Sequence, residues 1–97
     1  MQKIQVIVKA GDKKSEALIA SLKKNKVNFS EWFIDDNDVK KRLLDDGKFS
    51  EKFCDFTSCE IAIPIIRVDE TGEYHYKTLF GNKGLQVDVV KKIIGMR

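Results

Sequence analysis

A proline interrupts the most strongly β-branched stretch of the chain, and this feature restricts the fold more than any other. The stretch runs from Glu60 to Val68 and places Pro64, the only proline among 97 residues, between isoleucines. Proline has no backbone N–H, so within a sheet it is confined to an edge strand, the first residue of a strand or a bulge. Pro64 therefore predicts a strand that starts or bends at this residue.

Alternating apolar residues and turn residues divide the rest of the chain into further elements. The predicted strands are Lys3–Lys9, Val27–Ile34, Glu60–Val68 and Glu73–Phe80, and the predicted helices begin at Asp12, at Asp35–Asp38 and after Gly81–Gly84. Gly47 is expected to end or kink the second helix, and Lys48–Ser58 is either a further helical turn or a loop packed onto the core.

The connections between these elements fix how the strands pair. A strand–helix–strand unit at the start of the chain requires parallel pairing with a right-handed crossover. The short turn at Asp69–Gly72 requires antiparallel pairing of the last two strands. The sequence thus predicts one α/β domain over residues 1–97, in the order β-α-β-α-β-β-α, with a mixed four-stranded sheet and helices on both faces.

Composition and charge exclude several classes of protein. Apolar residues make up 42% and charged residues 34% of the chain, which is typical of a folded globular domain. The net charge of +3 is spread along the chain, so nucleic acid is not an expected partner. The N-terminus has no long apolar stretch, and we expect a cytoplasmic protein without membrane contact, monomeric or weakly dimeric, in which a structural disulfide is not anticipated.

Two segments resemble the glutaredoxin-like proteins of the thioredoxin superfamily. The run Ile63–Ile66 resembles the element in which these proteins place a cis-proline at the start of their third strand. The segment Lys26–Asp36 resembles their "Gly-Val-x-Tyr/Phe-x-Glu" phrase, which leads into the second strand. The resemblance implies a thioredoxin/glutaredoxin-like fold and a cis peptide bond between Ile63 and Pro64.

The chain departs from that family where the family carries its redox pair, Lys-x-Gly-Cys-x-x-Cys. It has Lys9–Ser15 there, with Asp12 at the position of the nucleophile and Ser15 at that of the resolving cysteine. Neither a carboxylate nor a hydroxyl can form a mixed disulfide, so the usual dithiol exchange is excluded. The turn Gly81–Gly84 only partly resembles the glutathione-holding turn of the family, so no cofactor is expected, and whether glutathione binds stays open.

These residues lead to the prediction of a non-enzymatic binding module. By the resemblance, its surface is the groove beside Pro64, which would hold a protein or a small peptide-like ligand. The predicted groove residues are Lys9, Gly11, Asp12, Lys13, Ser15, Ile63 and Pro64. Asp12 also has a simpler role as the N-cap of the first helix, and the lysines around it as a solvated face.

The two cysteines support an alternative. Cys54 and Cys59 are either small core residues or a reversible disulfide close to Pro64, which would make the chain a divergent redox protein. With one histidine they cannot complete a closed zinc site, so no metal is expected. His75 is expected on the surface, without an acidic partner. The aromatic residues are expected mostly in the core or on the sheet: Trp32, Phe33, Phe49, Phe53, Phe56, Tyr74, Tyr76 and Phe80.

Overall fold

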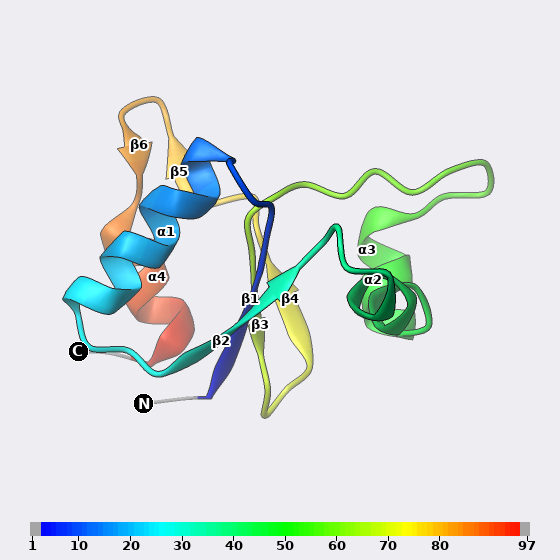
Figure 1. Ribbon diagram of the computed structural model, residues 1–97, viewed down its shortest axis with the longest axis horizontal. Coiled ribbons are helices and arrows are strands. Elements are labelled where there is room, and N and C mark those ends of the chain that lie inside the picture. Colours follow the sequence, from blue (N-terminus) through cyan, green and yellow to red (C-terminus); the bar gives the residue numbers. More distant parts are fainter. Residues whose placement is uncertain (1–2, 96–97) are drawn as a thin grey trace.

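A mixed sheet with helices on both faces forms the centre of the computed structural model, which describes residues 3–95 (Figure 1). The elements in chain order are β1 (Ile4–Val8), α1 (Lys13–Lys24), β2 (Phe29–Phe33), α2 (Asn37–Leu44), α3 (Gly47–Phe53), β3 (Ile65–Val68), β4 (Glu73–His75), β5 (Phe80–Gly81), β6 (Gly84–Leu85) and α4 (Val87–Ile94). Among these helices none is long and apolar enough to cross a membrane.

The four-stranded sheet has the strand order β2-β1-β3-β4. β1 pairs in parallel with β2, and β3 pairs antiparallel with both β1 and β4. The predicted architecture, including the mixed sheet and its helices, is confirmed. β1 is the central strand, and all five of its residues are buried because helices cover both of its faces.

Each face of the sheet has its own apolar core. Ile4, Val6 and Val8 of β1 pack against α1 and α4, while Ile7 faces α2 and α3 on the opposite side. Figure 1 shows the two pairs of helices on either side of the sheet, with α1 and α4 together and α2 and α3 together. The alternation of β1 residues between the two cores follows from the period of two in a strand.

Three aspartates set the starts of the first three helices. Asp12, Asp36 and Asp46 each occupy the N-cap of α1, α2 and α3, and each carboxylate accepts a hydrogen bond from a backbone N–H of the first turn. The prediction for Gly47 was wrong: α2 already ends at Leu44, with Asp45 as its C-cap, and Gly47 is the first residue of α3, since Asp46 caps a new helix there.

The last strands are shorter than predicted. Only Ile65–Val68 of the Glu60–Val68 stretch is in the sheet, because β1 ends at Val8 and leaves no neighbour for the residues before Pro64. The Glu73–Phe80 stretch breaks after His75, where continued pairing would place Lys77 opposite Pro64, which has no N–H to donate. Phe80–Gly81 pairs instead with Gly84–Leu85 in a separate hairpin, so α4 begins only at Val87.

Several expected side-chain environments also differ. Phe33 is 41% exposed and Phe56 is fully exposed, so neither belongs to the core. Cys59 is exposed and Cys54 only half-buried, which corrects the expectation of two core cysteines. His75 is half-buried and does have an acidic neighbour, with Nε2 3.9 Å from a Glu73 oxygen. Burial lowers the pKa of His75, Lys52 lowers it further, and Glu73 opposes both effects.

Candidate functional site

The residues predicted to form a groove lie at the end of the sheet where β1 stops. Ile7 is opposite Ile65, so Pro64 lies beside the carboxyl end of β1, from which the chain turns through Gly11 into α1. The peptide bond between Ile63 and Pro64 is cis. The start of α1 and the start of β3 therefore meet at one end of the sheet, the upper end in Figure 1.

Asp12, Ser15 and the backbone of Lys9 form a closed hydrogen-bond network at this end. Asp12 Oδ2 accepts from Ser15 N at 2.9 Å and from Ser15 Oγ at 2.8 Å. Ser15 Oγ in turn accepts from Lys9 N at 3.2 Å, and its side chain is buried. The two Ser15 hydrogen bonds, followed by the nearby lysines, lower the pKa of Asp12, so this group remains a carboxylate and is unsuited to act as a general base.

The remaining groove residues differ in exposure. Lys9, Gly11 and Lys13 are exposed, whereas Pro64 is buried and Ile63 is half-buried against the core under α2 and α3. Gly11 has a φ of +77°, a conformation that favours glycine, and a side chain there would meet no atom within 4 Å. This end of the sheet therefore presents ammonium groups, a fixed carboxylate and apolar surface, but no thiol.

Tyr76 belongs to the same end of the sheet, although the sequence analysis assigned it only to the sheet or core. His75 lies opposite Ile66, so Tyr76 follows β4 next to Ile65. Its ring packs on Phe53 with centroids 4.6 Å apart and is half-buried. The position of Tyr76 at this end of the sheet depends on where β4 ends. The sequence does not show that end, because the apolar alternation continues to Phe80.

Cys54 and Cys59 form a disulfide, which the expectation of a reducing environment did not anticipate. The bridge closes a loop that extends away from the sheet between α3 and Pro64 (Figure 1). Asp55 Oδ1 accepts hydrogen bonds from Thr57 N at 2.8 Å and Ser58 N at 2.9 Å, so the loop is ordered by its own contacts as well. Phe56 is fully exposed in this loop.

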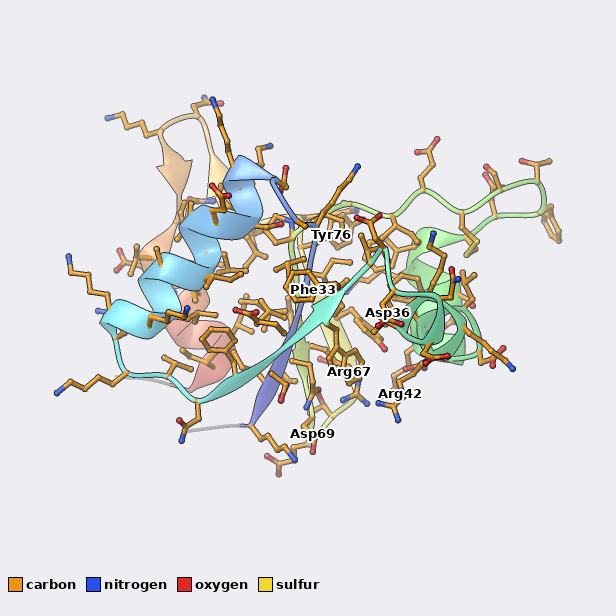
Figure 2. All side chains as sticks on the ribbon, viewed as in Figure 1. Phe33, Asp36, Arg42, Arg67, Asp69 and Tyr76 are labelled. Carbon is orange, nitrogen blue, oxygen red and sulfur yellow. A yellow bond between two sulfur atoms is a disulfide. The ribbon has the colours of Figure 1, made fainter. Side chains whose placement is uncertain are left out.

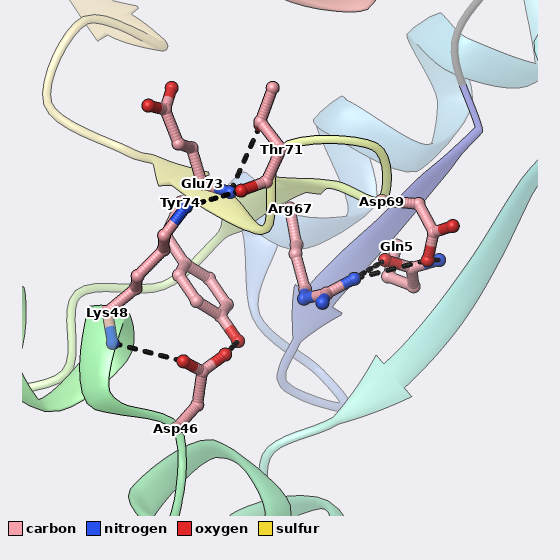
Figure 3. A network of polar contacts seen from close by, with 8 residues as sticks. All are labelled: Gln5, Asp46, Lys48, Arg67, Asp69, Thr71, Glu73 and Tyr74. Carbon is pink, nitrogen blue, oxygen red and sulfur yellow. Dashed lines mark hydrogen bonds and ion pairs between the residues drawn. The ribbon is translucent and has the colours of Figure 1, made fainter.

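A second polar cluster lies on the sheet face that carries α2 and α3 (Figures 2 and 3). Arg67 Nη1 donates to Gln5 Oε1 at 2.7 Å and to Asp69 Oδ1 at 3.3 Å, and Gln5 Nε2 also donates to Asp69 Oδ1. The Tyr74 hydroxyl donates to Asp46 Oδ2 at 2.8 Å. Burial, reinforced by this bond to Asp46, raises the pKa of Tyr74 to about 12, so its hydroxyl stays protonated at neutral pH.

This cluster borders an open concavity of about 520 Å³, and sequence reasoning did not identify it. It is lined by Trp32, Arg42, Asp45, Asp46, Arg67, Asp69 and Tyr74. Within residues 3–95 no buried side-chain nitrogen or oxygen lacks a hydrogen-bond partner. The cluster therefore satisfies itself and ties β1, β3, β4 and α3 together, which is a structural role. No group of His, Cys, Asp and Glu side chains within residues 3–95 could hold a metal ion.

Comparison with known proteins identifies the fold. No protein-family model matches the chain, and no curated protein matches it. Among solved structures, the crystal structure of a mutant of the thioredoxin-like protein BC3987 is similar over 100% of both chains, with a TM-score of 0.65 and 19% sequence identity. The chain thus has a thioredoxin-like fold, and Asp12 and Ser15 stand at the start of its first helix.

Proposed function

We propose that this protein is a thioredoxin-fold binding module that does not exchange disulfides at the start of α1. The hydrogen-bonded pair of Asp12 and Ser15 carries this proposal. The exchange reaction needs a thiolate that attacks a disulfide sulfur and a second thiol that releases the product. Here the first position holds a carboxylate committed to capping the helix, and the second holds a buried hydroxyl.

The binding surface of this proposal is the groove between Gly11–Ser15 and Ile63–Pro64. In open α/β sheets, ligands bind in the crevice outside the carboxyl ends of the strands, at the point where the strand order reverses. β1 has this position, with β2 on one side and β3 on the other. The exposed Lys9 and Lys13 and the half-buried Ile63 suit a protein segment or a small peptide-like ligand.

The first test is a glutathione-dependent disulfide reduction assay with the purified protein. We expect no turnover above the uncatalysed rate, with an ordinary glutaredoxin as the positive control. Turnover comparable to that control would contradict the proposal.

A second candidate function is redox chemistry at the displaced cysteine pair. The observation that favours it is the disulfide between Cys54 and Cys59, in which Cys59 is exposed and accessible to an attacking thiolate. An incoming glutathione thiolate would form a mixed disulfide with one sulfur and release the other as a thiolate, and a second glutathione would then release the first cysteine and leave as oxidised glutathione.

This candidate predicts that the bridge responds to the glutathione couple. Native protein would be equilibrated at graded ratios of reduced to oxidised glutathione and then alkylated. Mass spectrometry would measure the fraction of the protein that carries the added alkyl groups. We expect the alkylated fraction at Cys54 and Cys59 to rise as the ratio rises. A bridge that stays closed at every ratio, or thiols that never form one, would exclude redox activity at this pair.

A further inference from the structure

The outer edge of β2 has no partner strand among the residues that the structure describes. β2 stands at the end of the strand order, and within residues 3–95 it pairs only with β1. Figure 1 looks onto this edge: β2 passes in front of the other strands, and no helix or strand is drawn over it. An unpaired edge of this kind can accept a further strand from another chain.

The direction of the β2 backbone groups follows from one hydrogen bond. Ile34 N donates to Val8 O at 2.8 Å, so Ile34 faces β1. The N–H and C=O of one residue in a strand point to the same side, and consecutive residues alternate. Ser30 and Trp32 therefore face β1 as Ile34 does, whereas Phe29, Glu31 and Phe33 direct their backbone N–H and C=O groups outward.

Proline, lysine and a bulge, three of the features with which proteins block such an edge, are missing from β2, and Glu31 is its one charged residue. Its sequence is Phe-Ser-Glu-Trp-Phe, with no proline and no lysine. Its five residues pair with β1 in unbroken register, so no bulge turns the edge away. Three of the five residues are aromatic, which is unusual for a strand edge that faces only water.

Surfaces for alternate side chains of an added strand lie on both sides of this edge. On the α2 side, a hollow of about 360 Å³ is lined by Trp32, Asp38, Val39 and Arg42. Phe33 is 41% exposed and belongs to the opposite face of the sheet, because it pairs with Val8. In strand addition, the main chain supplies affinity and such flanking surfaces select the side chains.

Charge indicates what kind of strand fits. Glu31 lies at the centre of the edge, and Asp35, Asp36 and Asp38 follow at its carboxyl end, all exposed. Two guanidinium groups lie over the Trp32 ring beside them, Arg42 at 5.2 Å and Arg67 at 5.7 Å from the centroid, and Arg67 is paired with Asp69 at 3.3 Å. The edge is therefore predominantly negative and complements basic side chains.

We infer that the free edge of β2 binds an extended, basic segment of a partner protein by strand addition, at a surface separate from the groove beside Pro64. A second copy of this chain is a poorer occupant. Antiparallel pairing of two β2 strands around Glu31 would place the two Glu31 carboxylates directly opposite each other, which is destabilising.

The test is an NMR titration of the isotope-labelled protein with a heptapeptide of alternating lysine and valine. We expect the amide signals of Phe29, Glu31 and Phe33 to shift and their hydrogen exchange to slow. Ser30 and Trp32 serve as internal controls, because their N–H groups already face β1. A matched heptapeptide of alternating glutamate and valine should bind at least about tenfold more weakly, since it faces the same carboxylates.

Two further comparisons test whether the backbone makes the contact. Glu31→Pro removes the central outward N–H and should weaken binding about tenfold or more, whereas Glu31→Ala keeps that N–H and should bind more tightly than Glu31→Pro. Glu31→Pro can be replaced, if it does not fold, by peptides tested against the unchanged protein. One heptapeptide is methylated on the backbone nitrogen of every lysine and the other on the backbone nitrogen of every valine, so each lacks one of the two sets of backbone N–H groups. Only one set of amides can face β2, so only one of these peptides should lose binding.

Several outcomes would overturn the inference. These are equal binding of the acidic and basic heptapeptides, equal binding of the two N-methylated versions, or shifts confined to Gly11–Ser15 and Ile63. A dimer in analytical ultracentrifugation that Glu31→Pro dissociates would show that a second copy occupies the edge instead. Shifts confined to Gly11–Ser15 and Ile63 would leave the proposed groove standing, so the two proposals fail separately.

Discussion

Phe49→Ala should lower the free energy of unfolding by about 3–5 kcal/mol, the range observed when a buried phenylalanine is truncated. Phe49 has no exposed surface and joins α3 to the sheet. Its ring lies 4.6 Å from that of Phe53 and 5.1 Å from that of Tyr74, between centroids. Because small domains are stable by only about 5–15 kcal/mol, this one change should leave the fold marginal.

Urea denaturation followed by tryptophan fluorescence would measure this loss, since Trp32 is the only tryptophan of the chain. Phe56→Ala is the matched control: it makes the same chemical change at a fully exposed position and should alter stability by less than about 0.5 kcal/mol. Similar losses for the two variants would mean that α3 and its loop do not pack as described.

A protein carrying both Asp12→Cys and Ser15→Cys should gain activity in the disulfide reduction assay, in which the unchanged protein is expected to be inactive. A thiol at position 12 would lie at the N-terminus of α1 near Lys9 and Lys14, which both lower the pKa of Asp12. The same environment lowers a thiol pKa, and a fall from about 8.5 to 7 raises the thiolate fraction at neutral pH more than tenfold. The buried position of Ser15 would hold the second thiol.

Ser15→Cys alone provides the control for this gain. It adds a buried thiol without a nucleophile at the helix start, and should remain inactive. The double variant loses the Asp12 cap, which costs about 0.5–2 kcal/mol, so its folding should be checked by circular dichroism. A folded double variant that forms the new disulfide but shows no turnover would mean that the groove beside Pro64 no longer accepts a disulfide substrate.

The order of elements could be predicted from the sequence because each signal is local. The apolar alternation of β1 and the Asp12 cap of α1 depend on residues next to one another, and the structure has both. The hairpin turn between β3 and β4 likewise needs only Asp69–Gly72, where Gly72 has a φ of +71°.

The ends of the strands and the polar clusters could not be predicted, because they depend on pairing across long distances in the chain. The strand after Pro64 is short because β1 ends at Val8, and nothing within Glu60–Val68 shows this. Arg67 finds its partner Gln5 only once β3 lies beside β1. The exposure of Phe33 and Phe56 was missed for a related reason, since apolar character predicts burial without saying whether a neighbour is present.

The position of β1 at the centre of the sheet has a consequence for how the chain folds during synthesis. Ile4 lies opposite Val68, so the neighbour of β1 on that side is 64 positions later in the sequence. A growing chain can form the β1–α1–β2 unit early, but β1 keeps an open edge until β3 has left the ribosome. Contacts of such long sequence separation slow folding. Until then the open edge of β1, an apolar strand, is available for mispairing and for chaperone binding.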